Sequence, residues 1–130
     1  MKIVPIYAAV LALMYIGLSV RTIRLRRMTR VPVGDGGNQA MLRAMRAHAN
    51  FAEYVPLTLL LLAFAELAGA RAWALHCVCT AFLIGRCSHA WGVSQVQEDF
   101  RFRVFGMAMT FAAITIASMY LLSRYLPRLA

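Results

Sequence analysis

Long apolar runs constrain the fold of this chain more than any other feature of its sequence. Residues 3–20 contain no charged side chain, and about 20 apolar residues in a helix cross the ~30 Å hydrocarbon core of a bilayer. Over the whole chain 62% of the residues are hydrophobic and the mean hydropathy is +0.65. Because backbone groups in lipid must be hydrogen-bonded internally, these runs predict an all-α integral membrane protein.

Short polar or glycine-rich breaks divide the chain into four predicted helices. The clearest break, residues 31–38, contains Pro32 and three glycines, which do not propagate a helix. The helices are expected at about residues 3–24, 38–67, 72–96 and 104–126. Tight connections between neighbours predict an up-down four-helix bundle, which forms one transmembrane domain over residues 1–130.

The arginines predict how this bundle is oriented in the membrane. Lysine and arginine together number 14, and the net charge is +9, but the arginines are distributed among apolar runs. We therefore interpret most of them as topology and headgroup anchors, and we expect contact with membrane lipids and no nucleic-acid partner. Arginines are most frequent after the first and third helices. The positive-inside rule then places both termini outside the cytoplasm.

A polar stripe follows one face of the second predicted helix. Arg43, Arg46, Asn50 and Glu53 are separated by three, four and three residues, which at about 100° per residue keeps them within about 80° of one another. Such groups are costly near lipid unless they pair or line a wet cavity. Their donors and acceptors suit a small zwitterionic, peptide-like ligand. Alternatively, Arg46 and Glu53 only pair across helices and stabilise the bundle.

The pattern R-x-x-x-N-x-x-E-Y-x-P-L at residues 46–57 resembles the MAPEG family, the membrane-associated proteins of eicosanoid and glutathione metabolism. The resemblance implies a homotrimer similar to bacterial microsomal glutathione transferases, located in the inner membrane. It also implies that glutathione, the co-substrate, binds between subunits near the cytoplasmic face. The family's second-helix ligands for glutathione match Arg46, Asn50, Glu53 and Tyr54.

The third helix matches the family less closely. Its pattern R-x-x-Y-x-x-G-Y aligns with residues 86–93, so Arg86 and His89 are candidate glutathione ligands by this resemblance. His89 and Val93 replace the two tyrosines of the pattern. A histidine can still donate a hydrogen bond, whereas a valine cannot.

The family's catalytic arginine lies at the start of the fourth helix and stabilises the glutathione thiolate. Arg101 and Arg103 are both candidates, and aligning Gly106 with a glycine common in that helix favours Arg103. A guanidinium beside a thiol favours the thiolate, which is the nucleophile. The resemblance therefore implies a detoxifying glutathione transferase or peroxidase that attacks lipophilic electrophiles from the bilayer.

Two other functions remain open at this stage. The replaced tyrosines are compatible with a family member that binds glutathione or lipid without catalysis. A small four-helix multidrug exporter is an alternative of another class, but it needs an embedded carboxylate, and Glu53 lies among arginines that would repel a cationic drug. The cysteines lack the spacing of a zinc site. We therefore predict no metal site and three inert, buried thiols.

Overall fold

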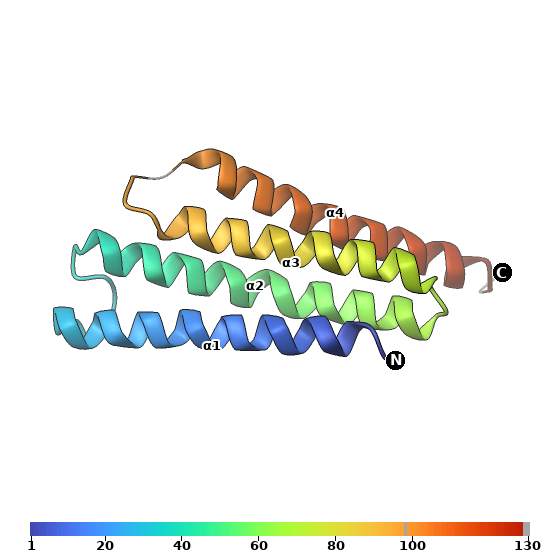
Figure 1. Cartoon of the computed structure of the whole chain (residues 1–130), viewed down its shortest axis with the longest axis horizontal. Coiled ribbons are helices and arrows are strands. Elements are labelled where there is room, and N and C mark those ends of the chain that lie inside the picture. The colour runs from blue at the N-terminus through green and yellow to red at the C-terminus, as the bar shows by residue number, and fades with distance from the viewer. Residues whose placement is uncertain (98, 129–130) are drawn as a thin grey trace.

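The computed structural model describes residues 1–97 and 99–128. These residues form four α-helices, α1 (Val4–Thr29), α2 (Gln39–Leu67), α3 (Ala72–Ser94) and α4 (Phe100–Tyr125), a short 3-10 helix η1 (Leu126–Arg128), and no strand. The α1–α2 and α3–α4 connections lie at one end of an elongated bundle, and the termini and the α2–α3 turn lie at the other (Figure 1). The predicted all-α class with four helices is confirmed.

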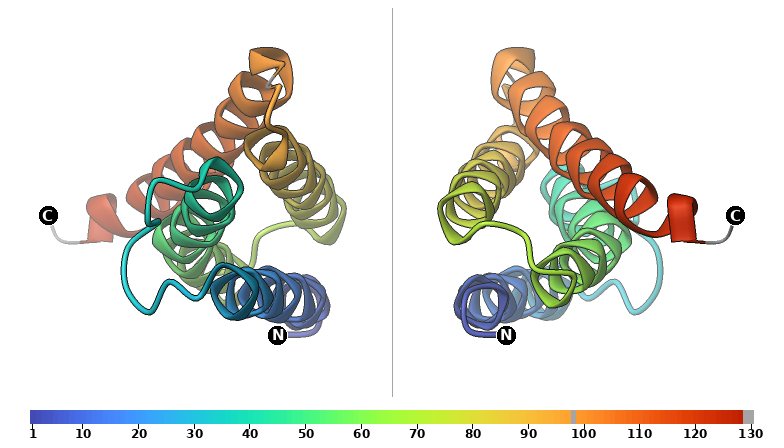
Figure 2. Two further views of the ribbon diagram at one scale, coloured as in Figure 1. Left: turned by 90° about the vertical axis from the view of Figure 1, so that its left-hand side faces the viewer. Right: turned by 90° about the vertical axis from the view of Figure 1, so that its right-hand side faces the viewer.

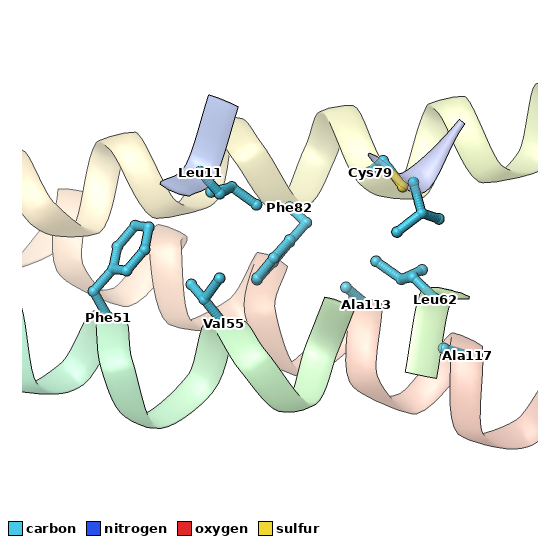
Figure 3. Packing of buried hydrophobic residues seen from close by; sticks show 9 residues of the cluster. Leu11, Phe51, Val55, Leu62, Cys79, Phe82, Ala113 and Ala117 are labelled. Carbon is cyan, nitrogen blue, oxygen red and sulfur yellow. The ribbon is translucent and has the colours of Figure 1, made fainter. Parts of the chain in front are cut away.

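All four helices contribute to an apolar core in the middle of the bundle. Leu11 from α1, Phe51 and Leu62 from α2, Phe82 from α3 and Ala113 from α4 belong to one cluster of buried side chains. Figure 3 shows these side chains pointing toward one another from the surrounding helices. The bundle is therefore held together at its centre by packing of large and small apolar groups.

Three of the four helices, α1, α2 and α4, are long and apolar enough to cross a membrane. Among the described residues, helix α3 falls outside this group, so length and composition support three of the four predicted spans. Arg86 and His89 lower its apolar content, yet both side chains are buried inside the bundle. Its outward face carries exposed apolar residues such as Ile84 and Trp91. The chain is a multi-pass integral membrane protein.

Two helix boundaries differ from the sequence prediction. Helix α1 continues past residue 24 and ends at Thr29, because the first interruption is Arg30 in the left-handed conformation, with φ of 53°. Helix α4 begins at Phe100, four residues before the predicted start, because the Asp99 carboxylate accepts a hydrogen bond of 2.9 Å from the backbone N–H of Arg101. The two candidate catalytic arginines therefore lie within the first turn of α4.

The N-terminus of α1 is anchored to the end of α2 by Glu66. Its carboxylate accepts hydrogen bonds from the backbone N–H groups of Lys2, Ile3 and Val4, the last two at 2.9 Å. The first N–H groups of a helix have no partner within the helix, and no side chain at the N-cap position supplies one here. Glu66 satisfies them from a neighbouring helix.

Helices α3 and α4 approach each other closely through glycines. A Cβ atom at Gly106 would lie 2.5 Å from the carbonyl oxygen of Gly85 and 2.5 Å from the Cβ of His89. At Gly92 a Cβ atom would lie 2.9 Å from the Cβ of Phe102. Such small residues allow helix backbones to pack in contact inside a membrane. The start of α4 is thereby held against the end of α3.

We predict that Gly106→Ala destabilises the protein by roughly 1–3 kcal/mol, because the added methyl group overlaps backbone atoms that cannot move independently. Gly17→Ala is the matched control, since nothing lies within 4 Å of a Cβ atom at that position in α1, and it should stabilise by roughly 0.5–1 kcal/mol. Thermal unfolding in mild detergent measures both effects. Equal unfolding midpoints for Gly106→Ala and wild type would show that the close approach is dispensable.

Candidate functional site

A polar pocket of about 470 Å³ lies between the beginning of α2, the end of α3 and the beginning of α4. These segments meet at the end of the bundle that holds the α1–α2 and α3–α4 connections (Figure 1). The lining residues are Gln39, Leu42, Arg43, Arg46, Asn50, His89, Val93, Phe100 and Arg103. Three of these are arginines and, among the described residues, no acidic side chain lines the pocket. The site is therefore suited to an anion.

The orientation of α2 turns its polar stripe toward this pocket. Asn38 caps the helix by accepting a hydrogen bond of 3.0 Å from the backbone N–H of Met41. Met41, Ala44 and Ala47 are buried against the rest of the bundle. Arg43 lies next to this buried face and lines the pocket together with Arg46 and Asn50, which follow it on the same side of α2. Burial of the neighbouring face of α2 thus turns its polar stripe toward the pocket.

Arg86 lies behind the pocket wall and not in the pocket. It is fully buried, and its guanidinium donates to Asn50 Oδ1 at 2.8 Å and to Thr110 Oγ1 at 3.3 Å. The guanidinium also lies 5.4 Å from the ring centroid of Phe51, a distance at which a cation is attracted to an aromatic ring. Arg86 therefore joins α2, α3 and α4, and it orients Asn50, which does line the pocket.

Within the described part of the chain, the positive charge of Arg86 has only neutral partners. No carboxylate contacts it, and its Nε donor has no hydrogen-bond acceptor there. A buried charge without a counter-ion is costly. An anion bound in the adjacent pocket would reduce that cost, so Arg86 adds to the preference of the site for anions from behind its wall.

Glu53 and Tyr54, two further predicted ligands, do not line this pocket. Glu53 is exposed on α2, and its carboxylate makes no hydrogen bond or ion pair with any described residue. Tyr54 is half-buried and packs edge-on against Phe111, with ring centroids 5.8 Å apart. The polar stripe is therefore divided between the pocket and the outer surface of the bundle.

The two candidate catalytic arginines lie on different sides of α4. Arg103 lines the polar pocket. Arg101 instead lines a separate groove beside Trp91, Phe102 and Phe105 on the outer side of α3 and α4. Residues two apart on a helix diverge by about 200°, so only one of the pair can face a ligand in the polar pocket. The structure brings Arg103 there.

Four of the pocket's lining residues were not among the predicted site residues: Gln39, Leu42, Val93 and Phe100. Gln39 and Leu42 precede Arg43 on the same side of α2 and could have been found by extending the helical spacing toward the N-terminus. Phe100 was missed because α4 was expected to begin later. His89 and Val93, which replace the family's tyrosines, both line the pocket and are buried, so this wall combines an imidazole with an apolar surface.

The cysteines correct one further expectation. Cys79 is buried, but Cys77 and Cys87 are exposed on the surface of the bundle, so the prediction of three buried thiols is wrong for two of them. The reason is their spacing on α3, where positions 77 and 87 turn away from the core that position 79 faces. Among the described residues, no three histidine, cysteine or acidic side chains are grouped to hold a metal.

The fold and the site together define a small multi-pass helical membrane protein with a basic pocket between three helices. Comparison with known proteins specifies the family. The profile of the MAPEG family matches residues 4–123, and the chain belongs to this family. Two relatives named "Inner membrane protein YecN", from Escherichia coli strain K12 and strain O6:H1, are each 36% identical to it over 111 residues. The aligned region covers 85% of this chain and 83% of each relative.

We predict that Asn50→Ala lowers the free energy of unfolding by about 1.5–3 kcal/mol, because it removes a hydrogen-bond acceptor from a buried charge. Asn50→Asp keeps an acceptor at the same place and adds a counter-charge for Arg86, so its unfolding midpoint should stay near or above that of wild type. Thermal unfolding of the detergent-solubilised protein compares the two variants. If Asn50→Ala were as stable as Asn50→Asp, the contact with Arg86 would contribute nothing.

Proposed function

We propose that this protein is a glutathione-dependent transferase or peroxidase that acts on lipophilic electrophiles entering from the bilayer. The observation that carries the proposal is the polar pocket, which collects Arg43, Arg46, Asn50, His89 and Arg103 from three different helices. Glutathione is an anionic tripeptide with carboxylates, amides and a thiol. The pocket offers guanidinium groups for the carboxylates and an amide and an imidazole for the peptide groups.

In the proposed mechanism, Arg103 is the catalytic residue and faces the sulfur of bound glutathione. Its guanidinium favours the thiolate over the thiol by direct charge interaction. In the transferase reaction the sulfur forms a bond to the electrophilic carbon, and the displaced group leaves with the bonding electrons. Val93 and Phe100 give the pocket an apolar side next to Arg103, where the apolar part of an electrophile can bind.

The homotrimer and the location of the site are part of the same proposal. Arg46 and Glu53 are exposed, and within the described part of one chain neither side chain has a hydrogen-bond or ion-pair partner. Charged groups at membrane depth need partners, and a neighbouring subunit would supply them. The pocket lies at the arginine-rich end of the bundle, which the positive-inside rule places in the cytoplasm. We propose the inner membrane, as the names of the relatives say of those proteins.

A member that binds glutathione or lipid without catalysis is the second candidate. It is favoured by His89 and Val93, because they stand where the family pattern has tyrosines. A multidrug exporter receives no support from the pocket, since three arginines line it and would repel a cationic drug. Measurements of binding and of thiolate formation separate the first two candidates.

We predict that Arg46→Ala raises the dissociation constant for glutathione at least about tenfold, because a hydrogen bond from arginine to a charged group contributes about 1.5–3 kcal/mol. Arg27→Ala is the matched control, since Arg27 is an exposed arginine of α1 outside the pocket. Titration calorimetry in detergent measures both. An unchanged affinity for Arg46→Ala would exclude this residue from the site.

We predict that Arg103→Ala leaves glutathione affinity within a few-fold of wild type but raises the pKa of the bound thiol toward about 8.5, the value of a free cysteine thiol. Thiolate absorbance and turnover should then fall at neutral pH and recover in alkali. Arg101→Ala should change neither, because Arg101 lies outside the pocket.

If Arg101→Ala abolishes thiolate formation and Arg103→Ala leaves it unchanged, the catalytic residue is Arg101 and not Arg103. If wild type binds glutathione without forming thiolate, and both variants behave like it, the catalytic proposal fails and the binding member remains.

A further inference from the structure

A second pocket lies at the opposite end of the bundle, where the two termini and the α2–α3 turn are found (Figures 1 and 2). Its volume is about 410 Å³, within the roughly 300–1,000 Å³ typical of small-molecule sites. The end of α2, the beginning of α3 and the end of α4 form its walls. Leu62, Leu75 and Ala117 line it and are almost fully buried, so its interior is apolar.

Two arginines, Arg71 and Arg124, line the same pocket. Arg71 immediately precedes α3, whereas Arg124 lies in the last turn of α4. Both are exposed, and neither guanidinium group makes a hydrogen bond or ion pair with another described residue. No acidic side chain is among the pocket's described lining residues. The pocket therefore combines an apolar interior with two guanidinium groups that can donate hydrogen bonds to a ligand.

The pocket exists because contacts at this end of the bundle fix the positions of α2, α3 and α4. The hydroxyl of Tyr120 donates a hydrogen bond of 3.3 Å to the carbonyl of Ala68, which ties α4 to the α2–α3 turn. Gly69 allows that turn with a φ of 84°, which other residues rarely adopt. Small side chains, including Ala65 and Ala74, line the pocket and leave room between the helices.

We propose that this pocket binds a single-chain anionic amphiphile. The hydrocarbon chain would lie between α2, α3 and α4, in contact with Leu62 and Leu75, and the phosphate or carboxylate head would be held by Arg71 and Arg124. The charges fit an anion, since arginine donors match phosphate and carboxylate geometry. Helices α2 and α4 are long enough to cross a membrane, so their ends lie near headgroup level, with the hydrocarbon region directly below. This site lies at the other end of the bundle from the polar pocket and does not depend on its function.

The test uses the purified full chain in an uncharged detergent, with dodecyl phosphate and dodecanoate as probes. At least one of them should raise the thermal unfolding midpoint in a saturable manner, because a ligand that binds only the folded state stabilises it. Dodecyltrimethylammonium, with the same chain and the opposite charge, and inorganic phosphate, with a head and no chain, should not. Equal stabilisation by the cationic amphiphile would overturn the proposal.

Two variants locate the binding. The double variant Arg71→Gln, Arg124→Gln should raise the dissociation constant of the anionic probe at least about tenfold, because two charge-assisted contacts are lost. Its control, Lys2→Gln with Arg27→Gln, removes the same net charge from residues outside the pocket and should leave binding within about twofold, since distant surface charges are screened by salt. Equal weakening by both pairs would mean that surface charge alone attracts the probe.

Ala74→Phe fills the pocket from a half-buried position and should abolish stabilisation by the probes. If this variant does not fold, the arginine pair alone decides the outcome. Extraction of lipids that co-purify with wild type and with Ala74→Phe identifies the natural source as a phosphate-headed membrane lipid or a free fatty acid. Equal amounts of both classes in wild type and a folded Ala74→Phe would contradict the site.

Discussion

Polar groups that enter a membrane must find partners inside the protein, and this constraint is most severe at Arg86. Its guanidinium is buried at the contact of α2, α3 and α4, where Asn50 and Thr110 accept its hydrogen bonds and the Phe51 ring lies beside it. Helix α3 carries this charge inward and can therefore present an apolar surface to lipid. The arrangement of the three helices, and of the pocket they enclose, depends on this contact.

Close backbone contact at glycines fixes the end of α3 and the beginning of α4 next to each other, near the buried Arg86. The approach of Gly106 to Gly85 and His89 holds the first turns of α4 against the last turns of α3. Arg103 and His89 thereby line one pocket although a connecting segment separates their helices. Larger residues at these positions would separate α3 from α4 and widen the site.

The two ends of the bundle have different chemistry because different side chains line the pocket at each end. At one end arginines from α2 and α4 surround a polar pocket suited to a peptide-like anion. At the other end small residues leave an apolar pocket next to Arg71 and Arg124. The chain belongs to the MAPEG family, and our two proposals assign glutathione to the first end and an anionic amphiphile to the second.

The sequence alone determined the membrane class, the number of helices and the polar face of α2, because apolar run length and helical spacing are local properties. It also supplied, through resemblance, the candidates Arg101 and Arg103. Only the tertiary structure decided which of them shares a pocket with Asn50, and that Arg86 lies behind the wall of that pocket. These outcomes depend on the rotation and close approach of helices distant in sequence, which glycine contacts and buried hydrogen bonds set and which no local pattern records.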